Sequence, residues 1–224
     1  MEGFLQFDGQ LLIGIQQALY ADWLTPVMKF ITMFGEAGIF SICCCAVMLA
    51  FKKTRRLGII CSASLLLSFI CCNLCLKPLV GRTRPWVTFP EVNALLPPPG
   101  DASFPSGHST NTMSPAWAMF LATLPGRARV TRDAEPGGHD TYLLKDYSLT
   151  PCLGWKGVGA DPRLMHRISI AAVILALLIG LSRLYLGMHY PSDVICGLLL
   201  GMICATIVHT IVIHYESKHG IIGE

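Results

Sequence analysis

Residues 171–193 read AAVILALLIGLSRLYLGMHYPSD, an aliphatic run that ends in a short polar segment. The aliphatic run belongs to a stretch over 168–187 that has the length of a membrane-crossing helix, because a hydrocarbon core about 30 Å thick needs roughly 20 helical residues. The polar segment places Ser182, Arg183, His189 and Asp193 directly at the end of this stretch. Ionisable groups at the edge of a membrane span are costly, so these residues are candidates for a functional site.

The composition of the whole chain predicts an integral membrane protein. Of 224 residues, 53% are hydrophobic and only 14% are charged, which is more apolar than an ordinary soluble domain. Further apolar stretches of about the length of a membrane span lie at 35–51, 57–76, 108–124 and 193–214. We therefore expect an all-α fold, a polytopic membrane bundle of about five to six transmembrane helices that forms a single domain over 1–224.

The segment 11–34 is also apolar, but Asp22 and Pro26 interrupt it. It fits either an interfacial helix followed by a short helix that dips into the membrane, or a sixth, irregular span.

The placement of basic residues predicts the orientation in the membrane. Cytoplasmic loops carry an excess of lysine and arginine. Basic residues fill the turn after the first predicted span and follow the third, at Lys52, Lys53, Arg55, Arg56, Arg127, Arg129 and Arg132. The opposite ends, which carry 77–107 and His189, are then extracytoplasmic. We expect a multi-pass protein of the cell (inner) membrane, and no cleavable signal peptide is evident at the N-terminus.

Two stretches interrupt the apolar pattern. Prolines and a glycine in 81–104 predict an ordered or semi-rigid loop. The segment 125–167 mixes both charge signs with many glycines, and it is predicted to be an atypical cytoplasmic insert, either loosely packed or a regulatory or partner-binding element. In the last span, Gly197 and Gly201 have the small-xxx-small spacing that lets helices approach closely, most simply within one subunit.

Three polar groups are predicted to meet at the extracytoplasmic face, and their cations indicate an anion site. Lys77, Arg84 and Arg183 have few acidic neighbours, and such a set suits the nonbridging oxygens of a phosphate. Ser106 and Gly107 precede a predicted helix, whose N-terminus also favours phosphate. We expect these five residues to bind the substrate phosphate.

The two histidines of these groups fit an acid and a nucleophile. If a helix begins near Pro191, Asp193 can reach back to His189, fix its tautomer and strengthen it as a nucleophile. His108, at the start of another span, is then the candidate general acid. A metal site is not expected, because cations surround the pair and no further ligand set accompanies it. Most of the ten cysteines lie inside predicted spans, and the C-x-x-C at Cys72 and Cys75 has no second pair.

With these residues, the chain resembles the type 2 phosphatidic acid phosphatase (PAP2) superfamily, which is related to the vanadium haloperoxidases. The family patterns K-x6-R-P, P-S-G-H and S-R-x5-H-x3-D match Lys77 to Pro85, Pro105 to His108, and Ser182 to Asp193. The resemblance covers about 11–212, apart from the insert. It implies a metal-independent, cofactor-free phosphatase in which His189 becomes a phosphohistidine, His108 protonates the leaving group and water releases phosphate.

The resemblance also implies a lipid phosphate substrate in the bilayer and no nucleic-acid partner. Undecaprenyl diphosphate is favoured, with phosphatidylglycerophosphate or phosphatidate as alternatives. Two other functions remain open: a lipid phosphotransferase that uses the same phosphohistidine, and a non-catalytic anion-binding membrane protein. Nothing in the residues predicts the oligomeric state.

Overall fold

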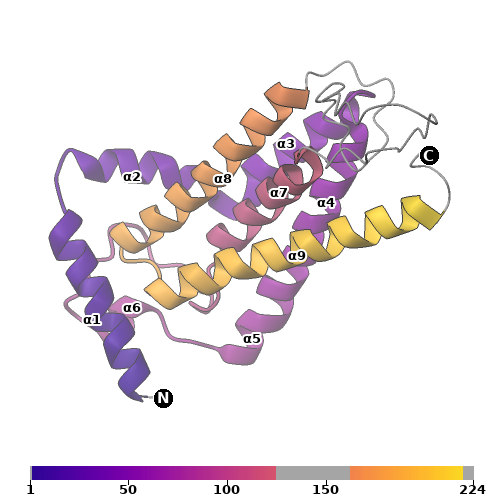
Figure 1. Ribbon diagram of the computed structural model, residues 1–224. Helices are drawn as coiled ribbons and strands as arrows, with labels where there is room; N and C mark the ends of the chain where they lie inside the picture. The colour runs from indigo at the N-terminus through magenta and orange to yellow at the C-terminus, as the bar shows by residue number, and fades with distance from the viewer. Residues whose placement is uncertain (1, 125–161, 219–224) are drawn as a thin grey trace, which may run out of the picture.

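The computed structural model of the chain describes residues 2–124 and 162–218, and no strand occurs among them (Figure 1). The predicted all-α membrane fold is confirmed. In chain order, the elements are α1 Glu2–Leu19, α2 Leu24–Met33, the 3-10 helix η1 Glu36–Gly38, α3 Ile39–Ala50, α4 Arg55–Phe69, the π-helical segment η2 Ile70–Leu76, α5 Lys77–Val80, α6 Pro85–Thr88, α7 Gly107–Thr123, α8 Pro162–Tyr185 and α9 Pro191–Lys218.

Among the residues that the structure describes, three helical segments are long and apolar enough to cross a membrane. They are Arg55–Thr88, Arg163–Tyr185 and Pro191–Tyr215. The shorter helices α3 and α7 coincide with the other two predicted spans. Many large apolar side chains on the outer faces of these helices are exposed, including Ile42, Leu66 and Ile174, as expected of a helix bundle whose outside is solvated by lipid. The chain is a multi-pass membrane protein.

The helix α7 is the centre of the bundle and packs against α4, α8 and α9. Glycines on α9 allow the closest of these contacts. A Cβ atom on Gly201 would lie 2.7 Å from the carbonyl oxygen of Thr110, and one on Gly197 would lie 2.7 Å from that of Ser106. Both distances are too short for a side chain, so the small-xxx-small pair packs α9 onto α7 inside the subunit.

The segment 11–34 forms two helices rather than one span. The chain turns between α1 and α2, where α1 ends at Leu19, and neither helix is among those long and apolar enough to cross a membrane. The helix α1 contacts α8 and α9, whereas α2 contacts α8 (Figure 1). The segment 11–34 is therefore not a single continuous helix.

The loop 81–104 is ordered, as predicted, with one helical turn at α6. Its apolar side chains pack into a buried cluster with α1 and the α8–α9 turn, formed by Leu12, Phe89, Val92 and Tyr190. Its backbone is tied at Leu95, whose N–H donates to the Leu186 carbonyl at 3.1 Å. The predicted insert at 125–167 lies outside the described residues, apart from 162–167, which form the first turns of α8.

Candidate active site

The predicted site residues gather at one end of the bundle, where α5 ends, α7 begins and α8 turns into α9 (Figure 1). Lys77 begins α5, Arg84 precedes α6, and Ser106 caps α7. A backbone hydrogen bond joins two of the motifs directly, because the Ser106 N–H donates to the Asp193 carbonyl at 3.0 Å. The structure thus brings together two motifs whose bonded residues, 106 and 193, are far apart in the sequence.

His189 and Asp193 form a buried pair, and α9 begins at Pro191 as predicted. The Nδ1 atom of His189 lies 3.5 Å from Oδ2 of Asp193. The same carboxylate oxygen accepts hydrogen bonds from the Tyr190 N–H at 3.0 Å and from the Ser103 hydroxyl at 2.5 Å. These donors fix the carboxylate, so that it faces one nitrogen of the imidazole.

The other nitrogen of His189 faces a cation. Nη1 of Arg84 lies 3.1 Å from Nε2 of His189. Arginine has only donors, so Nε2 must be the acceptor and the proton must lie on Nδ1, toward Asp193. Burial lowers the pKa of His189, and the charges of Arg84 and Arg183 lower it further; although Asp193 opposes both effects, the pKa falls to about 4. At neutral pH the imidazole therefore carries a lone pair on Nε2.

Two of the predicted phosphate-binding cations share one carboxylate. Nη2 of Arg84 donates to Oδ1 of Asp101 at 2.5 Å, and Nζ of Lys77 contacts Oδ2 of the same group. Burial alone raises the pKa of Asp101, but the hydrogen bond and charge of Lys77, together with Arg84, outweigh it and lower the pKa to about 2. An anion thus already lies between Lys77 and Arg84. The side chain of Asp101 is 49% exposed, so it is the accessible member of the cluster.

The third predicted cation, Arg183, is held from another direction. It is 3% exposed, and its Nη1 donates to the Thr32 hydroxyl of α2 at 2.9 Å. Its Nε atom is buried without a hydrogen-bond partner, and so is Nε2 of His108. Buried donors without partners are rare, and these two leave polar capacity for a ligand within the predicted site.

The start of α7 places Gly107 against Lys77 and His108 next to Glu36. A Cβ atom on Gly107 would lie 3.6 Å from Nζ of Lys77, so the glycine allows the cation to approach the helix N-terminus. The hydroxyl of Ser106 caps the helix and accepts from the Ser109 N–H at 3.5 Å. Because the N–H of Ser106 is already bonded, the first free N–H groups of the helix follow it. Nε2 of His108 lies 3.7 Å from Oε2 of Glu36.

Sequence reasoning missed a third arginine of the site, Arg82. Its Nη1 donates to Oδ1 of Asp193 and to the Ser192 hydroxyl, both at 2.7 Å, and its Nη2 donates to Oδ2 of Asp8 at 2.7 Å. The guanidinium also lies over the ring of Tyr190, 3.9 Å from its centroid. The sequence offered two signals: Arg82 is a cation two residues before Arg84, and Asp8 is an acid in an apolar N-terminal segment.

Asp101 and Ser103 were also missed, although they directly precede the P-S-G-H motif. They contact Lys77, Arg84 and Asp193 only because the loop folds back over the site. Within residues 2–124 and 162–218, no three or more histidine, cysteine, aspartate or glutamate side chains are grouped so as to hold a metal ion. The cationic centre of the site suits an anionic ligand instead.

Two curated proteins are similar in sequence to this chain. The chain is 29% identical over 178 residues to an undecaprenyl-diphosphatase of Sulfolobus acidocaldarius, covering 80% of this chain and 66% of that protein. It is 29% identical over 189 residues to phosphatidylglycerophosphatase B of Bacillus subtilis, covering 81% of this chain and 71% of that protein. The chain thus spans about two thirds of the length of these curated relatives.

The fold is also that of a solved membrane protein. The crystal structure of a transmembrane PAP2 type phosphatidylglycerolphosphate phosphatase from Bacillus subtilis superposes with a TM-score of 0.65 at 23% identity, covering 97% of this chain and 88% of that one. The sequence model of the PAP2 superfamily matches residues 57–215, which contain all three motifs. The chain belongs to the PAP2 superfamily.

Proposed function

We propose that the protein is a lipid phosphatase that removes the phosphate or diphosphate head group of a membrane lipid through a phosphohistidine at His189. The observation that carries the proposal is the position of Arg84, which faces Nε2 of His189 on one side and holds the Asp101 carboxylate on the other. A phosphate that displaces Asp101 would meet Lys77 and Arg84 beside the lone pair of the nucleophile. Undecaprenyl diphosphate is the favoured substrate, followed by phosphatidylglycerophosphate or phosphatidate.

The proposed reaction has two steps. In the first, Nε2 of His189 attacks phosphorus, the bond from phosphorus to the lipid oxygen breaks, and His108 donates a proton to that oxygen. In the second, His108 takes a proton from water, the water oxygen attacks phosphorus, and the bond from phosphorus to Nε2 breaks to release phosphate. Asp193 stabilises the charged imidazole while the phosphohistidine exists.

The cations have a separate role in this proposal. Lys77, Arg84 and Arg183 neutralise the nonbridging oxygens, on which charge is concentrated in phosphoryl transfer, and the first N–H groups of α7 add their dipoles. Anionic phosphate next to His108 favours the protonated form that the first step needs.

We also propose that the site faces the extracytoplasmic side of the cell membrane. The basic turn between α3 and α4 lies at the end of the bundle opposite α5 and α6 (Figure 1), and basic turns favour the cytoplasm. The head group of a lipid in the outer leaflet then reaches the site while its chain stays in the bilayer.

A substrate panel tests the proposal. Purified protein in detergent is given undecaprenyl diphosphate, phosphatidylglycerophosphate, phosphatidate and a soluble phosphate ester, with excess chelator, and released phosphate is measured. We expect release from at least one lipid that survives the chelator. Transfer of labelled phosphoryl only to a second lipid would indicate a phosphotransferase, and anion binding without turnover would indicate a non-catalytic protein.

A further inference from the structure

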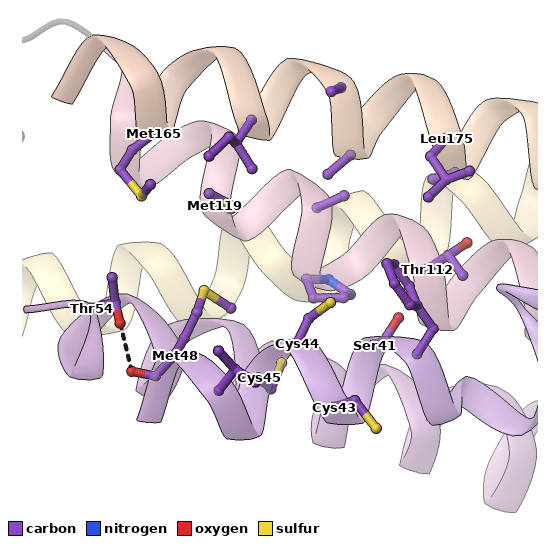
Figure 2. Close-up of a pocket in the computed structure, with 18 of the residues that line it drawn as sticks. Ser41, Cys43, Cys44, Cys45, Met48, Thr54, Thr112, Met119, Met165 and Leu175 are labelled. Carbon is purple, nitrogen blue, oxygen red and sulfur yellow. Dashed lines mark hydrogen bonds between the residues drawn. The ribbon is translucent and has the colours of Figure 1, made fainter. Parts of the chain in front are cut away.

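A long apolar groove runs between α3 and α8, with α7 as its floor (Figure 2). The helix α3 packs on α4 while α8 packs on α7 and α9, which leaves the facing sides of α3 and α8 apart. The groove has a volume of about 970 Å³. Figure 2 shows Cys44 and Met48 on the α3 side, with Met165 and Leu175 on the α8 side and Met119 on α7 between them.

The groove is long enough for a hydrocarbon chain. The helix α8 lines it from Met165 to Ile179, a rise of about 21 Å at 1.5 Å per residue. One leaflet of a hydrocarbon core is about 15 Å thick, so the groove spans a whole leaflet and more. Polar side chains are few along its length, and the lysines among its lining residues, Lys52 and Lys53, lie at the end away from the site.

The other end of the groove adjoins His108. The Thr112 hydroxyl, which lines the groove, donates to the His108 carbonyl at 2.6 Å. A Cβ atom on Gly35 would lie 2.7 Å from Cδ2 of His108 and 2.9 Å from Cγ2 of Ile179. Gly35 therefore packs directly against both the imidazole and Ile179, which its lack of a side chain allows, and this places the end of the groove next to His108.

We propose that this groove holds the hydrocarbon chain of the substrate lipid, so that the chain leaves the phosphate site on the His108 side. This inference rests on the proposed function, in which His108 gives its proton to the oxygen that carries the lipid. In an in-line displacement the attacking and leaving atoms lie on opposite sides of phosphorus. The residues that contact His189, namely Arg84, Ser103 and Asp193, do not line the groove.

The groove acts by positioning rather than by hydrophobic attraction. Lipid tails in a bilayer are as apolar as the groove, so leaving the bilayer gains little free energy. A chain laid between α3 and α8 nevertheless fixes the direction of the ester oxygen, and a misplacement of 1 Å at a reacting centre can cost on the order of 10²-fold in rate. Chain occupancy should therefore appear in kcat/KM.

A blocking variant with a matched control tests this placement. Ala172 lines the groove on α8, whereas Ala46 on α3 is exposed and does not line it. The variants Ala172→Phe and Ala46→Phe are assayed with lipid phosphates of graded chain length and with p-nitrophenyl phosphate. We expect Ala172→Phe to lower kcat/KM for chains of leaflet length by about tenfold or more and to leave p-nitrophenyl phosphate hydrolysis unchanged, with Ala46→Phe behaving as wild type.

Equal losses on both kinds of substrate, or the same loss in Ala46→Phe, would overturn the placement. A measurement on the wild-type protein does not depend on whether the variants fold. A phosphonate lipid with a diazirine at the chain end should crosslink to α3 and α8. Equal crosslinking by a choline lipid with the same chain would indicate a bilayer lipid in the groove, and crosslinked dimers would indicate a second copy; either result rejects the proposal. Absence of phosphate release from every substrate would instead reject the proposed function.

Discussion

Nη1 of Arg82 donates to Oδ1 of Asp193 at 2.7 Å, while Oδ2 of the same carboxylate faces Nδ1 of His189. The guanidinium also donates to Asp8 of α1 at 2.7 Å. Asp193 is fully buried, so its orientation depends on these partners. Arg82 thus fixes the carboxylate on the side away from the imidazole and ties the N-terminal helix to the candidate nucleophile.

Arg82 is expected to act as a positioning residue. Replacing it in Arg82→Met leaves two buried carboxylates without their cation and lets Asp193 turn, so kcat should fall by about 10- to 100-fold while KM changes little. The charge lost next to Asp193 strengthens the carboxylate's pull on His189, so the acid limb of the pH profile should move to higher pH.

The conservative Arg82→Lys variant is the control. It should recover part of kcat and return the acid limb of the pH profile to its wild-type position. Thermal unfolding must be compared in parallel, because an unpaired buried charge also destabilises the fold. A loss of activity that follows stability alone, with an unmoved pH profile, would contradict the positioning role.

His189→Ala is expected to abolish turnover. Removing the nucleophile eliminates the covalent route, so phosphate release should drop by at least about 10³-fold. Rapid quench into alkali with labelled substrate should trap a phosphoprotein in wild type and none in the variant. The exposed His214 on α9 supplies a matched His→Ala control that should keep full activity. Substantial residual hydrolysis in His189→Ala would show that another group is the nucleophile.

Asp193→Asn should slow chemistry more than binding. The amide keeps the size of the side chain but cannot stabilise the imidazolium-like phosphohistidine, and it can favour the wrong tautomer of His189, so kcat should fall on the order of 10²- to 10⁴-fold. The affinity for a phosphonate inhibitor should stay within a few-fold of wild type, because Lys77, Arg84 and Arg183 are unchanged. Unaltered kcat would mean that Asp193 does not orient the histidine.

The motif residues were predictable because short stretches of sequence are enough to identify them. The apolar runs and the K-x6-R-P, P-S-G-H and S-R-x5-H-x3-D spacings were enough to place Lys77, Arg84, His108 and His189 at one end of an α-helical bundle. The length and composition of an apolar stretch identify a membrane span of roughly 20 residues, whichever helices it packs against in the fold.

The contacts across the fold were not predictable from these patterns. The pairing of Asp8 with Arg82 depends on how α1 lies over the α8–α9 turn, and that of Asp101 with Lys77 and Arg84 depends on the path of the loop 81–104. Proline and glycine content identifies a loop but not its course. The division of 11–34 into two helices also depends on packing, since α2 contacts α8.

The pH dependence of the reaction should reflect the lowered pKa of His189. Burial and nearby arginines bring that pKa to about 4, against about 6.5 for an ordinary histidine. Only the neutral imidazole is a nucleophile, so kcat/KM should persist below pH 6 and be lost as the pH falls through about 4. The inhibition constant of a phosphonate measured over the same range corrects for ionisation of the ligand. If kcat/KM still falls near pH 6.5 after this correction, a different histidine with an ordinary pKa determines the pH dependence.

Asp101 is expected to compete with substrate for the cations. With a pKa of about 2 it stays ionised at every working pH, and it occupies Lys77 and Arg84, which the phosphate must engage. While Asp101 occupies the cations, phosphate cannot bind them, so the apparent affinity for phosphate is reduced in proportion to the fraction of molecules whose site is open. Asp101→Asn should therefore tighten inhibition by inorganic phosphate by about three- to tenfold. Glu91→Gln, a change of an exposed carboxylate in the same loop, should leave inhibition unchanged. If Asp101→Asn instead weakens phosphate inhibition, the carboxylate aligns the two cations for the substrate, and its displacement is not part of binding.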